Sequence, residues 1–201
     1  MRVRFACGDL QLEGELTSPA APQQGAVICH PHPQYGGDMN NSVVLALARA
    51  LDAAGYATLR FNFRGVGGST GAYANAIGEV DDARAATRCL SERSGVQRVT
   101  LAGYSFGAMV ILRAGPTLAA VDRLIAVAPP LAFFSLQELQ ECPKAKLFVV
   151  GDGDRYCSVA ELSRQLQTVA EPKTQQIVPG ADHFFLGHEA TIARAVRAFV
   201  E

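Results

Sequence analysis

The sequence contains no block of like charges, and its charged residues nearly cancel. It has 18 lysines and arginines against 19 aspartates and glutamates, for a formal net charge of -1. Proteins that bind nucleic acids or anionic membranes normally carry clustered basic residues. We therefore expect neither a nucleic-acid partner nor a membrane partner.

Long apolar runs are missing as well. The opening segment, MRVRFACGDLQLEG, reaches charged residues before any apolar stretch attains the length of a signal peptide. No later window approaches the length of a transmembrane span. On these grounds we expect a cytoplasmic protein.

Paired cysteines are a third absence. The chain has five cysteines, an odd number, and none of them stands in a C-x-x-C spacing. They are Cys7, Cys29, Cys89, Cys142 and Cys157. This pattern favours reduced thiols over a disulfide framework or a zinc site.

The overall composition is that of a folded protein. Hydrophobic residues make up 49% of the chain and charged residues 18%, which gives no sign of disorder. A length of 201 residues is enough to bury a sizeable core and suits one α/β domain. We predict a single domain spanning residues 1–201.

The most informative stretch is Arg98–Ala114, RVTLAGYSFGAMVILRA. An apolar run of strand type precedes GYSFG, and apolar residues then recur at helical spacing. This matches the Gly-x-Ser-x-Gly nucleophile elbow, in which a serine occupies a sharp strand-to-helix corner. Ser105 holds that corner and is our candidate nucleophile. The alternative is a serine that only caps a helix, but the two glycines, Gly103 and Gly107, and the preceding strand favour the elbow.

The rest of the chain alternates between strand-like and helix-like segments. Arg2–Cys7 and Leu10–Leu16, separated by Gly8-Asp9, predict an antiparallel hairpin at a sheet edge. Further strands are predicted at Ala26–His30, Ala57–Phe61, Arg123–Ala128, Lys146–Gly151 and Thr174–Val178. Helices are predicted from Ser42, which would be the cap, to Gly55, and at Glu79–Ser91, Val159–Thr168 and His188–Val200, with a short one allowed within Leu131–Glu141. This alternation predicts an α/β fold, a mostly parallel sheet with helices on both faces.

A glycine-rich loop, Asn62–Gly78, contains RGVGGSTG and superficially resembles a phosphate-binding loop. It lacks the Lys-Ser/Thr ending of a P-loop, and its glycines do not form G-x-G-x-x-G followed at once by a helix. We therefore expect no nucleotide and no other cofactor.

Candidate catalytic groups follow the carboxyl ends of the predicted strands, where parallel sheets carry their active sites. They lie in His30–Gln34, at Ser105, in Asp152–Arg155 and in Asp182–His183. A serine hydroxyl needs a base within hydrogen-bond reach and a carboxylate that orients this base. The chain order of serine, aspartate and histidine is that of the α/β-hydrolases.

The sequence resembles the α/β-hydrolase superfamily over nearly its full length, and within it the small dienelactone-hydrolase-like and carboxylesterase-like members. The resemblance rests on HPHPQYGGDMNN, RFNFRGVGGSTG, GYSFG, GDGD and ADHFF, in that order. It implies that Asp154, at the last position of a Gly-x-x-Asp pattern, is the triad acid. Asp152 is the alternative. It also implies that His183, in a loop after a strand, is the base, whereas His188 is expected to begin the last helix.

The resemblance also suggests the two oxyanion donors. The residue after the nucleophile, Phe106, supplies one backbone N–H. HPHP is similar to the family's His-Gly-x-Pro loop with Pro31 in place of glycine, which makes His32 the second donor. Pro31 and Pro33 have no N–H and cannot be the donor. Gln34, the next residue of the loop, is the alternative to His32. His30 and His32 could instead form a metal pair, but no third ligand has matching spacing, and we expect no metal.

We therefore expect a serine hydrolase that cleaves a carboxylic ester or thioester of a small or short-acyl substrate through an acyl-enzyme. The alternative is a binding or scaffolding module on the same fold that lacks activity. Related enzymes with a lid usually insert it after the strand that corresponds here to Arg123–Ala128. Only the 17 residues of Pro129–Ala145 are available there, and a parallel crossover itself takes about a dozen. We predict that the protein has no cap domain.

Overall fold

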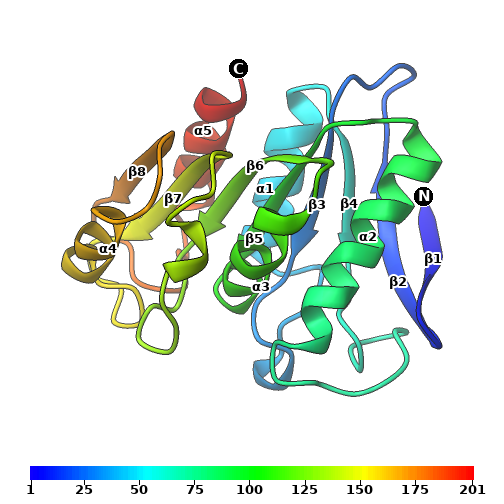
Figure 1. Cartoon of the computed structure of the whole chain (residues 1–201), viewed down its shortest axis with the longest axis horizontal. Coiled ribbons are helices and arrows are strands. Elements are labelled where there is room, and N and C mark those ends of the chain that lie inside the picture. Colours follow the sequence, from blue (N-terminus) through cyan, green and yellow to red (C-terminus); the bar gives the residue numbers. More distant parts are fainter.

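An eight-stranded sheet runs through the computed structural model, which describes all 201 residues (Figure 1). The strand order is β1-β2-β4-β3-β5-β6-β7-β8. The strands are β1 (Arg2–Cys7), β2 (Leu10–Thr17), β3 (Gly25–Cys29), β4 (Ala57–Phe61), β5 (Val99–Tyr104), β6 (Val121–Val127), β7 (Ala145–Gly151) and β8 (Lys173–Val178). Each predicted strand is present, with bounds that differ by at most two residues.

The sheet has an antiparallel edge and a parallel body. β1 pairs antiparallel with β2, and β2 pairs antiparallel with β4, whereas every other neighbouring pair is parallel. Side chains of β1 alternate between exposed and buried, while β3 and β5 are buried along their whole length. This difference is expected, because a central parallel strand is covered by helices on both faces. The predicted α/β fold class and the N-terminal hairpin are confirmed.

Helices cover the two faces of the sheet unequally (Figure 1). On one face lie α2 (Gly78–Ser94), α3 (Phe106–Ala114) and α4 (Val159–Leu166), and on the other α1 (Ser42–Ala53) and α5 (Glu189–Val200). Each face has its own hydrophobic core cluster, the larger under the first group and the smaller under the second. The central strands are thereby packed on both faces.

Several details of the helices differ from expectation, among them the ends of α2, at Ser94 instead of Ser91, and of α4, at Leu166 instead of Thr168. The cap of α1 is Asn41, whose Oδ1 accepts from the Val43 N–H at 3.0 Å, and Ser42 is the first helical residue. Asparagine caps a helix as well as serine does, so the neighbouring residue took the role. The short helix that the sequence allowed within Leu131–Glu141 is a 3-10 helix of three residues, η3 (Gln137–Leu139). His188 caps α5 directly before its first residue, as expected.

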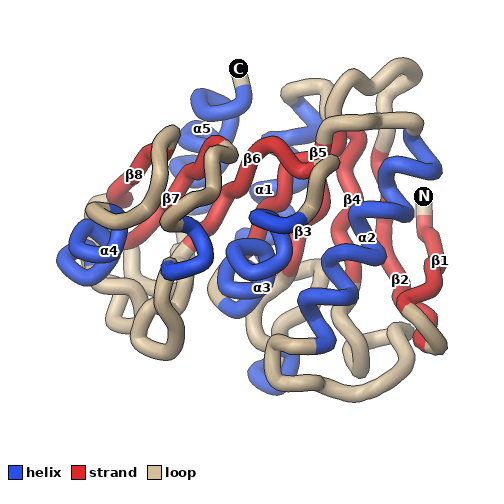
Figure 2. The backbone as a smooth tube through the Cα atoms, in the orientation of Figure 1, coloured by secondary structure: helices blue, strands red, loops and turns tan.

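The connections at the carboxyl ends of the parallel strands gather along one edge of the sheet (Figure 2). The connection from β6 to β7 carries no regular element except η3. No cap domain covers this edge, as predicted. No helix of the protein is both long and apolar enough to cross a membrane. All five cysteines are buried and unpaired.

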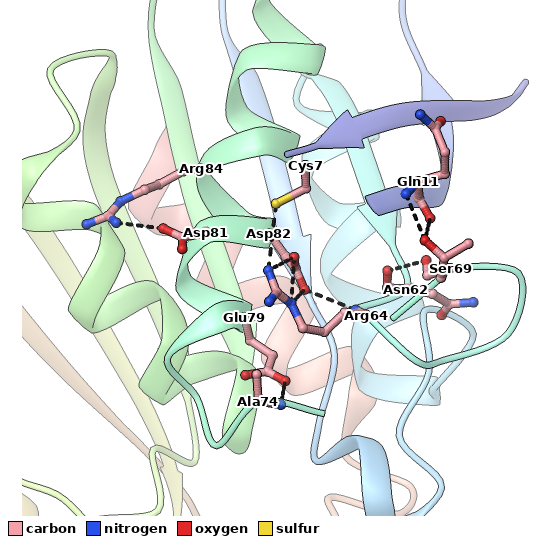
Figure 3. Close-up of polar contacts among 11 residues, drawn as sticks. Cys7, Gln11, Asn62, Arg64, Ser69, Ala74, Glu79, Asp81, Asp82 and Arg84 are labelled. Carbon is pink, nitrogen blue, oxygen red and sulfur yellow. Dashed lines mark hydrogen bonds and ion pairs between the residues drawn. The ribbon is translucent and has the colours of Figure 1, made fainter. Parts of the chain in front are cut away.

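The glycine-rich loop between β4 and α2 is held by polar contacts with its own surroundings (Figure 3). The Arg64 guanidinium pairs with the fully buried Asp82, whose Oδ2 also accepts from the Arg64 N–H at 3.0 Å. The Glu79 carboxylate accepts from the Ala74 N–H at 2.8 Å. A buried ion pair with several hydrogen bonds fixes geometry more than it adds stability. The loop therefore has a defined course between β4 and α2.

Candidate active site

Ser105 occupies a one-residue corner between β5 and α3. Its backbone has φ 53° and ψ -115°, a conformation that L-residues rarely adopt. A Cβ at Gly103 would collide with the Gly107 carbonyl, and a Cβ at Gly107 would collide with the Cys29 carbonyl at the end of β3. Both positions therefore require glycine for steric reasons, as the sequence predicted.

The strained corner is held on both sides by backbone hydrogen bonds. The Ser105 N–H donates to the Val127 carbonyl at 2.9 Å, and the Ser105 carbonyl accepts from the Met109 N–H at 3.1 Å. Such a conformation costs about 1–3 kcal/mol and persists only where the surroundings over-determine it. Strained conformations of this kind are characteristic of functional sites. Here the conformation directs the hydroxyl toward His183, in the loop after β8.

Three side chains form a continuous hydrogen-bonded chain at this corner. Ser105 Oγ lies 2.9 Å from His183 Nε2, and His183 Nδ1 lies 2.8 Å from Asp154 Oδ2. The Asp154 side chain is fully buried and that of His183 is 10% exposed. A carboxylate can only accept, so Nδ1 carries the proton and Nε2 is left to accept from the serine hydroxyl. The structure brings Ser105, His183 and Asp154 together with the connectivity that a serine nucleophile needs.

The second oxygen of Asp154 is held by the backbone. Oδ1 accepts from the N–H groups of Tyr156 at 2.8 Å and Cys157 at 2.9 Å. These two bonds satisfy a buried carboxylate without a cationic partner. Sequence reasoning missed them, although an aspartate that accepts from the N–H two or three residues later is a common local turn.

Asp152 has a different set of contacts from Asp154. Its Oδ1 accepts from the Gly180 N–H at 2.8 Å, and its side chain is exposed. Next to it the Gly153 N–H donates to the Ala181 carbonyl at 3.0 Å. A Cβ at Gly151 would collide with that same carbonyl. These contacts join the loops after β7 and β8 closely enough for Asp154 to reach His183.

Tyr104, the residue before the nucleophile, makes a further contact with the histidine loop that the sequence did not indicate. Its hydroxyl donates to the His183 carbonyl at 2.9 Å. The side chain is buried, and burial raises the pKa of this phenol well above its usual value. The neutral hydroxyl therefore anchors the histidine loop to the strand that carries the serine.

The two histidines after β3 are engaged with the chain itself. His30 is fully buried, its Nδ1 lies 2.6 Å from the Pro31 carbonyl, and its Nε2 accepts from the Phe63 N–H at 3.0 Å. Burial lowers the pKa of His30 from 6.5 to about 4. His32 Nδ1 accepts from the Gln34 N–H at 3.2 Å, and burial lowers the pKa of this imidazole too.

The backbone N–H groups beside Ser105 differ in whether they have a partner. The His32 N–H has no acceptor within the chain, and Phe106, as the first residue of α3, has no intrahelical acceptor. The Gln34 N–H is already used by His32 Nδ1. The His32 ring packs 4.9 Å from the Phe106 ring, so the loop after β3 lies against the residue that follows the nucleophile. The N–H groups of His32 and Phe106 are both left without a partner in the chain, and a free donor is what an oxyanion needs.

Comparison with known proteins places this geometry in context. A family model described as alpha/beta hydrolase fold matches residues 27–173. An uncharacterized protein of Rickettsia prowazekii (strain Madrid E) is 33% identical over 195 residues, which cover 92% of this chain and 81% of that protein.

Two solved structures are similar over their whole length. An alpha-beta serine hydrolase homologue from Coxiella burnetii is 34% identical, with a TM-score of 0.93, covering 100% of this chain and 97% of that one. A serine hydrolase without a lid from Xanthomonas campestris is 32% identical, with a TM-score of 0.88, covering 100% and 93%. The similarity therefore includes the open, uncapped edge.

Proposed function

Because this chain belongs to the alpha/beta hydrolase fold family, we propose that it is a serine hydrolase that cleaves carboxylic esters or thioesters through an acyl-enzyme. Its similarity to serine hydrolase homologues supports hydrolase activity in general. The observation that carries the finer proposal is the hydrogen-bonded chain from Ser105 through His183 to Asp154. The substrate would be a small molecule.

In the proposed mechanism Ser105 Oγ attacks the carbonyl carbon while His183 Nε2 takes the hydroxyl proton. The N–H groups of His32 and Phe106 bind the oxyanion of the tetrahedral intermediate. His183 then gives its proton to the leaving alcohol or thiol, and the acyl group stays on Ser105. In the second half of the reaction His183 Nε2 takes a proton from a water molecule, which attacks the acyl carbon, and then returns a proton to Ser105 Oγ as the acid is released. Asp154 keeps the Nδ1 proton in place throughout.

The uncapped edge supports a preference for small or short-acyl substrates. The connection from β6 to β7 adds no lid, and Ser105 itself is partly exposed. Each methylene buried in a deep pocket would raise kcat/KM about fourfold, from about 0.8 kcal/mol of transfer free energy. Across acetate, butyrate and octanoate esters of one alcohol we therefore expect a flat or falling series, without activation above the critical micelle concentration. A steep rise would contradict it.

A fluorophosphonate probe tests the proposed chemistry directly, because it reacts only with an activated serine. We expect stoichiometric labelling of the wild-type protein and none of Ser105→Ala, with ester hydrolysis lost in parallel. Ser135→Ala, which changes an exposed serine of the β6–β7 connection, is the control and should be labelled normally. A folded wild-type protein that resists the probe would favour the inactive binding module.

A further inference from the structure

Exposed large apolar side chains are concentrated on the side of the sheet that carries Ser105, at the carboxyl ends of the parallel strands. Most of them lie on the loops at the carboxyl edge of the sheet or directly before α2. They are Tyr35, Ile77, Phe133, Tyr156, Phe184 and Leu186. Exposed apolar groups that collect beside a reactive centre mark a binding surface.

Three of these side chains form a wall of rings beside His183, which we call the aromatic wall: Phe133, Tyr156 and Phe184. The Tyr156 ring meets the His183 ring edge-on with centroids 4.8 Å apart, and Phe184 lies 5.8 Å from it on a near-perpendicular plane. Phe133 lies 6.1 Å from Tyr156. The three side chains are 73%, 44% and 63% exposed, so they present their rings to solvent.

The wall is held in place by the backbone. The Ala132 N–H donates to the Tyr156 carbonyl at 3.0 Å, which joins the β6–β7 connection to the loop that carries Asp154. The Phe184 N–H donates to Asp182 Oδ1 at 2.9 Å. Rings on anchored backbone lose little conformational freedom when a ligand binds, which favours a specific contact.

The position of the wall relates it to one half of the substrate. In the proposed mechanism His183 Nε2 must come within hydrogen-bond reach of the leaving oxygen. The oxyanion, in contrast, points toward the His32 and Phe106 N–H groups. A group attached to the leaving oxygen would therefore begin beside His183, next to the Tyr156 and Phe184 rings that pack against the imidazole.

From this arrangement, and resting on the proposed serine hydrolase function, we propose that Phe133, Tyr156 and Phe184 bind the leaving alcohol or thiol of the substrate and that this half carries an aromatic ring. Ring pairs at edge-to-face or offset geometry are stabilised beyond the area that they bury. Three rings are also too small a patch for a stable dimer, which uses about 20–30 residues from each partner.

Three acetate esters isolate the contribution of the ring: 2-phenylethyl, 2-cyclohexylethyl and ethyl acetate. All give the same acetyl-enzyme, and their leaving groups are primary alkanols of similar acidity. We expect kcat/KM to be highest for the phenyl ester, exceeding the cyclohexyl ester by about 2- to 10-fold. The acyl-side pair, ethyl 3-phenylpropanoate and ethyl 3-cyclohexylpropanoate, should differ much less.

Phe133→Leu tests the wall without touching the hydrogen-bonded chain, because it removes a ring and keeps an apolar side chain. The phenyl-over-cyclohexyl ratio for the acetate pair should fall toward one, because one of the three rings is lost, while the ratio for the acyl-side pair does not change. Leu186→Ala is the control: Leu186 is another largely exposed apolar residue, in the histidine loop, but it has no ring, and the ratio should stay at its wild-type value.

The outcomes separate the two proposals. Hydrolysis of ethyl acetate without a ring preference in the wild-type protein would overturn the aromatic wall and leave the serine hydrolase intact. If the wild-type protein neither hydrolyses any of these esters nor reacts with the fluorophosphonate probe, the proposed function itself is overturned. An unchanged ratio in Phe133→Leu would show that its ring does not bind the leaving group. A wild-type protein that elutes as a dimer, with Phe133→Leu eluting as a monomer, would assign the rings to a contact between two copies of the chain.

Discussion

The loops after β3 and after β8 each place a buried histidine at the carboxyl end of a parallel strand, yet the two imidazoles have different partners. Both nitrogens of His30 are engaged by backbone groups, the Pro31 carbonyl and the Phe63 N–H. Both nitrogens of His183 are engaged by side chains, Asp154 and Ser105. His30 is fully buried and His183 nearly so, and the clearest difference between them is in their partners.

This contrast extends to the regions around the two histidines. In the region after β3 the side chains of His30 and His32 accept hydrogen bonds from backbone N–H groups, and the group that we propose for the oxyanion is also a backbone N–H, that of His32. In the region after β7 and β8 the backbone holds the side chains, as the Tyr156 and Cys157 N–H groups hold Asp154. Side-chain substitutions in the first region should therefore leave most of the activity, whereas substitution of Asp154 or His183 in the second should abolish it.

The largest difference in activity should be between a substitution of His183 and a substitution of His30. His183→Ala should lower kcat/KM about 10⁴-fold or more, because it removes one member of a unit that acts together. His30→Leu should retain kcat/KM within about tenfold at neutral pH. It removes two structural hydrogen bonds, and their loss should lower the free energy of unfolding instead of the activity. Ester hydrolysis and thermal unfolding of both variants measure the difference. Similar losses of activity in the two would erase the contrast.

Within the second region, the two aspartates of GDGD should differ almost as much. Asp154→Asn should lower kcat by about 10⁴-fold, because an amide no longer fixes the proton on His183 Nδ1. Asp152→Asn keeps an oxygen that can accept from the Gly180 N–H and should change kcat by less than about tenfold. Steady-state kinetics of the two variants decide, and the reverse ranking would make Asp152 the acid.

Backbone and side chain can be separated at His32, in the first region. Its φ of -56° is one that proline also adopts, so His32→Pro deletes the N–H with little change of path. Loss of one oxyanion donor should lower kcat about 10²- to 10³-fold. His32→Ala, which keeps the N–H and loses only the ring, is the control and should cost a few-fold. Equal losses would show that the imidazole itself takes part.

Much of the fold was predictable because its signals are local. Alternating residues marked the N-terminal hairpin and short apolar runs marked the central strands, and the steric need for Gly103 and Gly107 marked the corner at Ser105. Local signals also left errors of the expected kind, as where Asn41 rather than Ser42 caps α1. Two adjacent residues with similar capping ability cannot be ranked without knowing where the chain turns.

The contacts that the sequence did not reveal are mostly long-range. The Tyr104 hydroxyl and the His183 carbonyl are 79 residues apart in the chain, and the aromatic wall combines rings from three separate loops. No periodicity or spacing encodes such pairings, because they depend on how neighbouring strands end relative to one another. The sequence could therefore nominate the serine, histidine and aspartate, but not what positions them.

The buried state of His30 makes stability depend on pH. Its pKa falls from 6.5 to about 4 in the folded protein, so between these values the unfolded chain binds a proton that the folded one does not. The free energy of unfolding should therefore decrease as the pH falls from about 6.5 to about 4, by up to about 3 kcal/mol from this group. Urea unfolding across this range should show a shallower pH dependence in His30→Leu. Parallel curves would mean that His30 does not titrate in this way.

The smallest expected effect concerns Tyr104, which joins the nucleophile strand to the histidine loop. Tyr104→Phe removes the hydroxyl that donates to the His183 carbonyl and keeps the ring. We expect kcat per labelled active site to fall about tenfold with KM unchanged, because a loosened imidazole spends less time aligned with Ser105. Tyr56→Phe is the matched control, since it removes another buried tyrosine hydroxyl, one that donates to Gln24 Oε1 at 2.6 Å and lies before β4, away from the site. Both variants should lose about 1 kcal/mol of unfolding free energy, but only Tyr104→Phe should lose kcat. If kcat falls equally in both, or in neither, Tyr104 stabilises the fold without positioning the base.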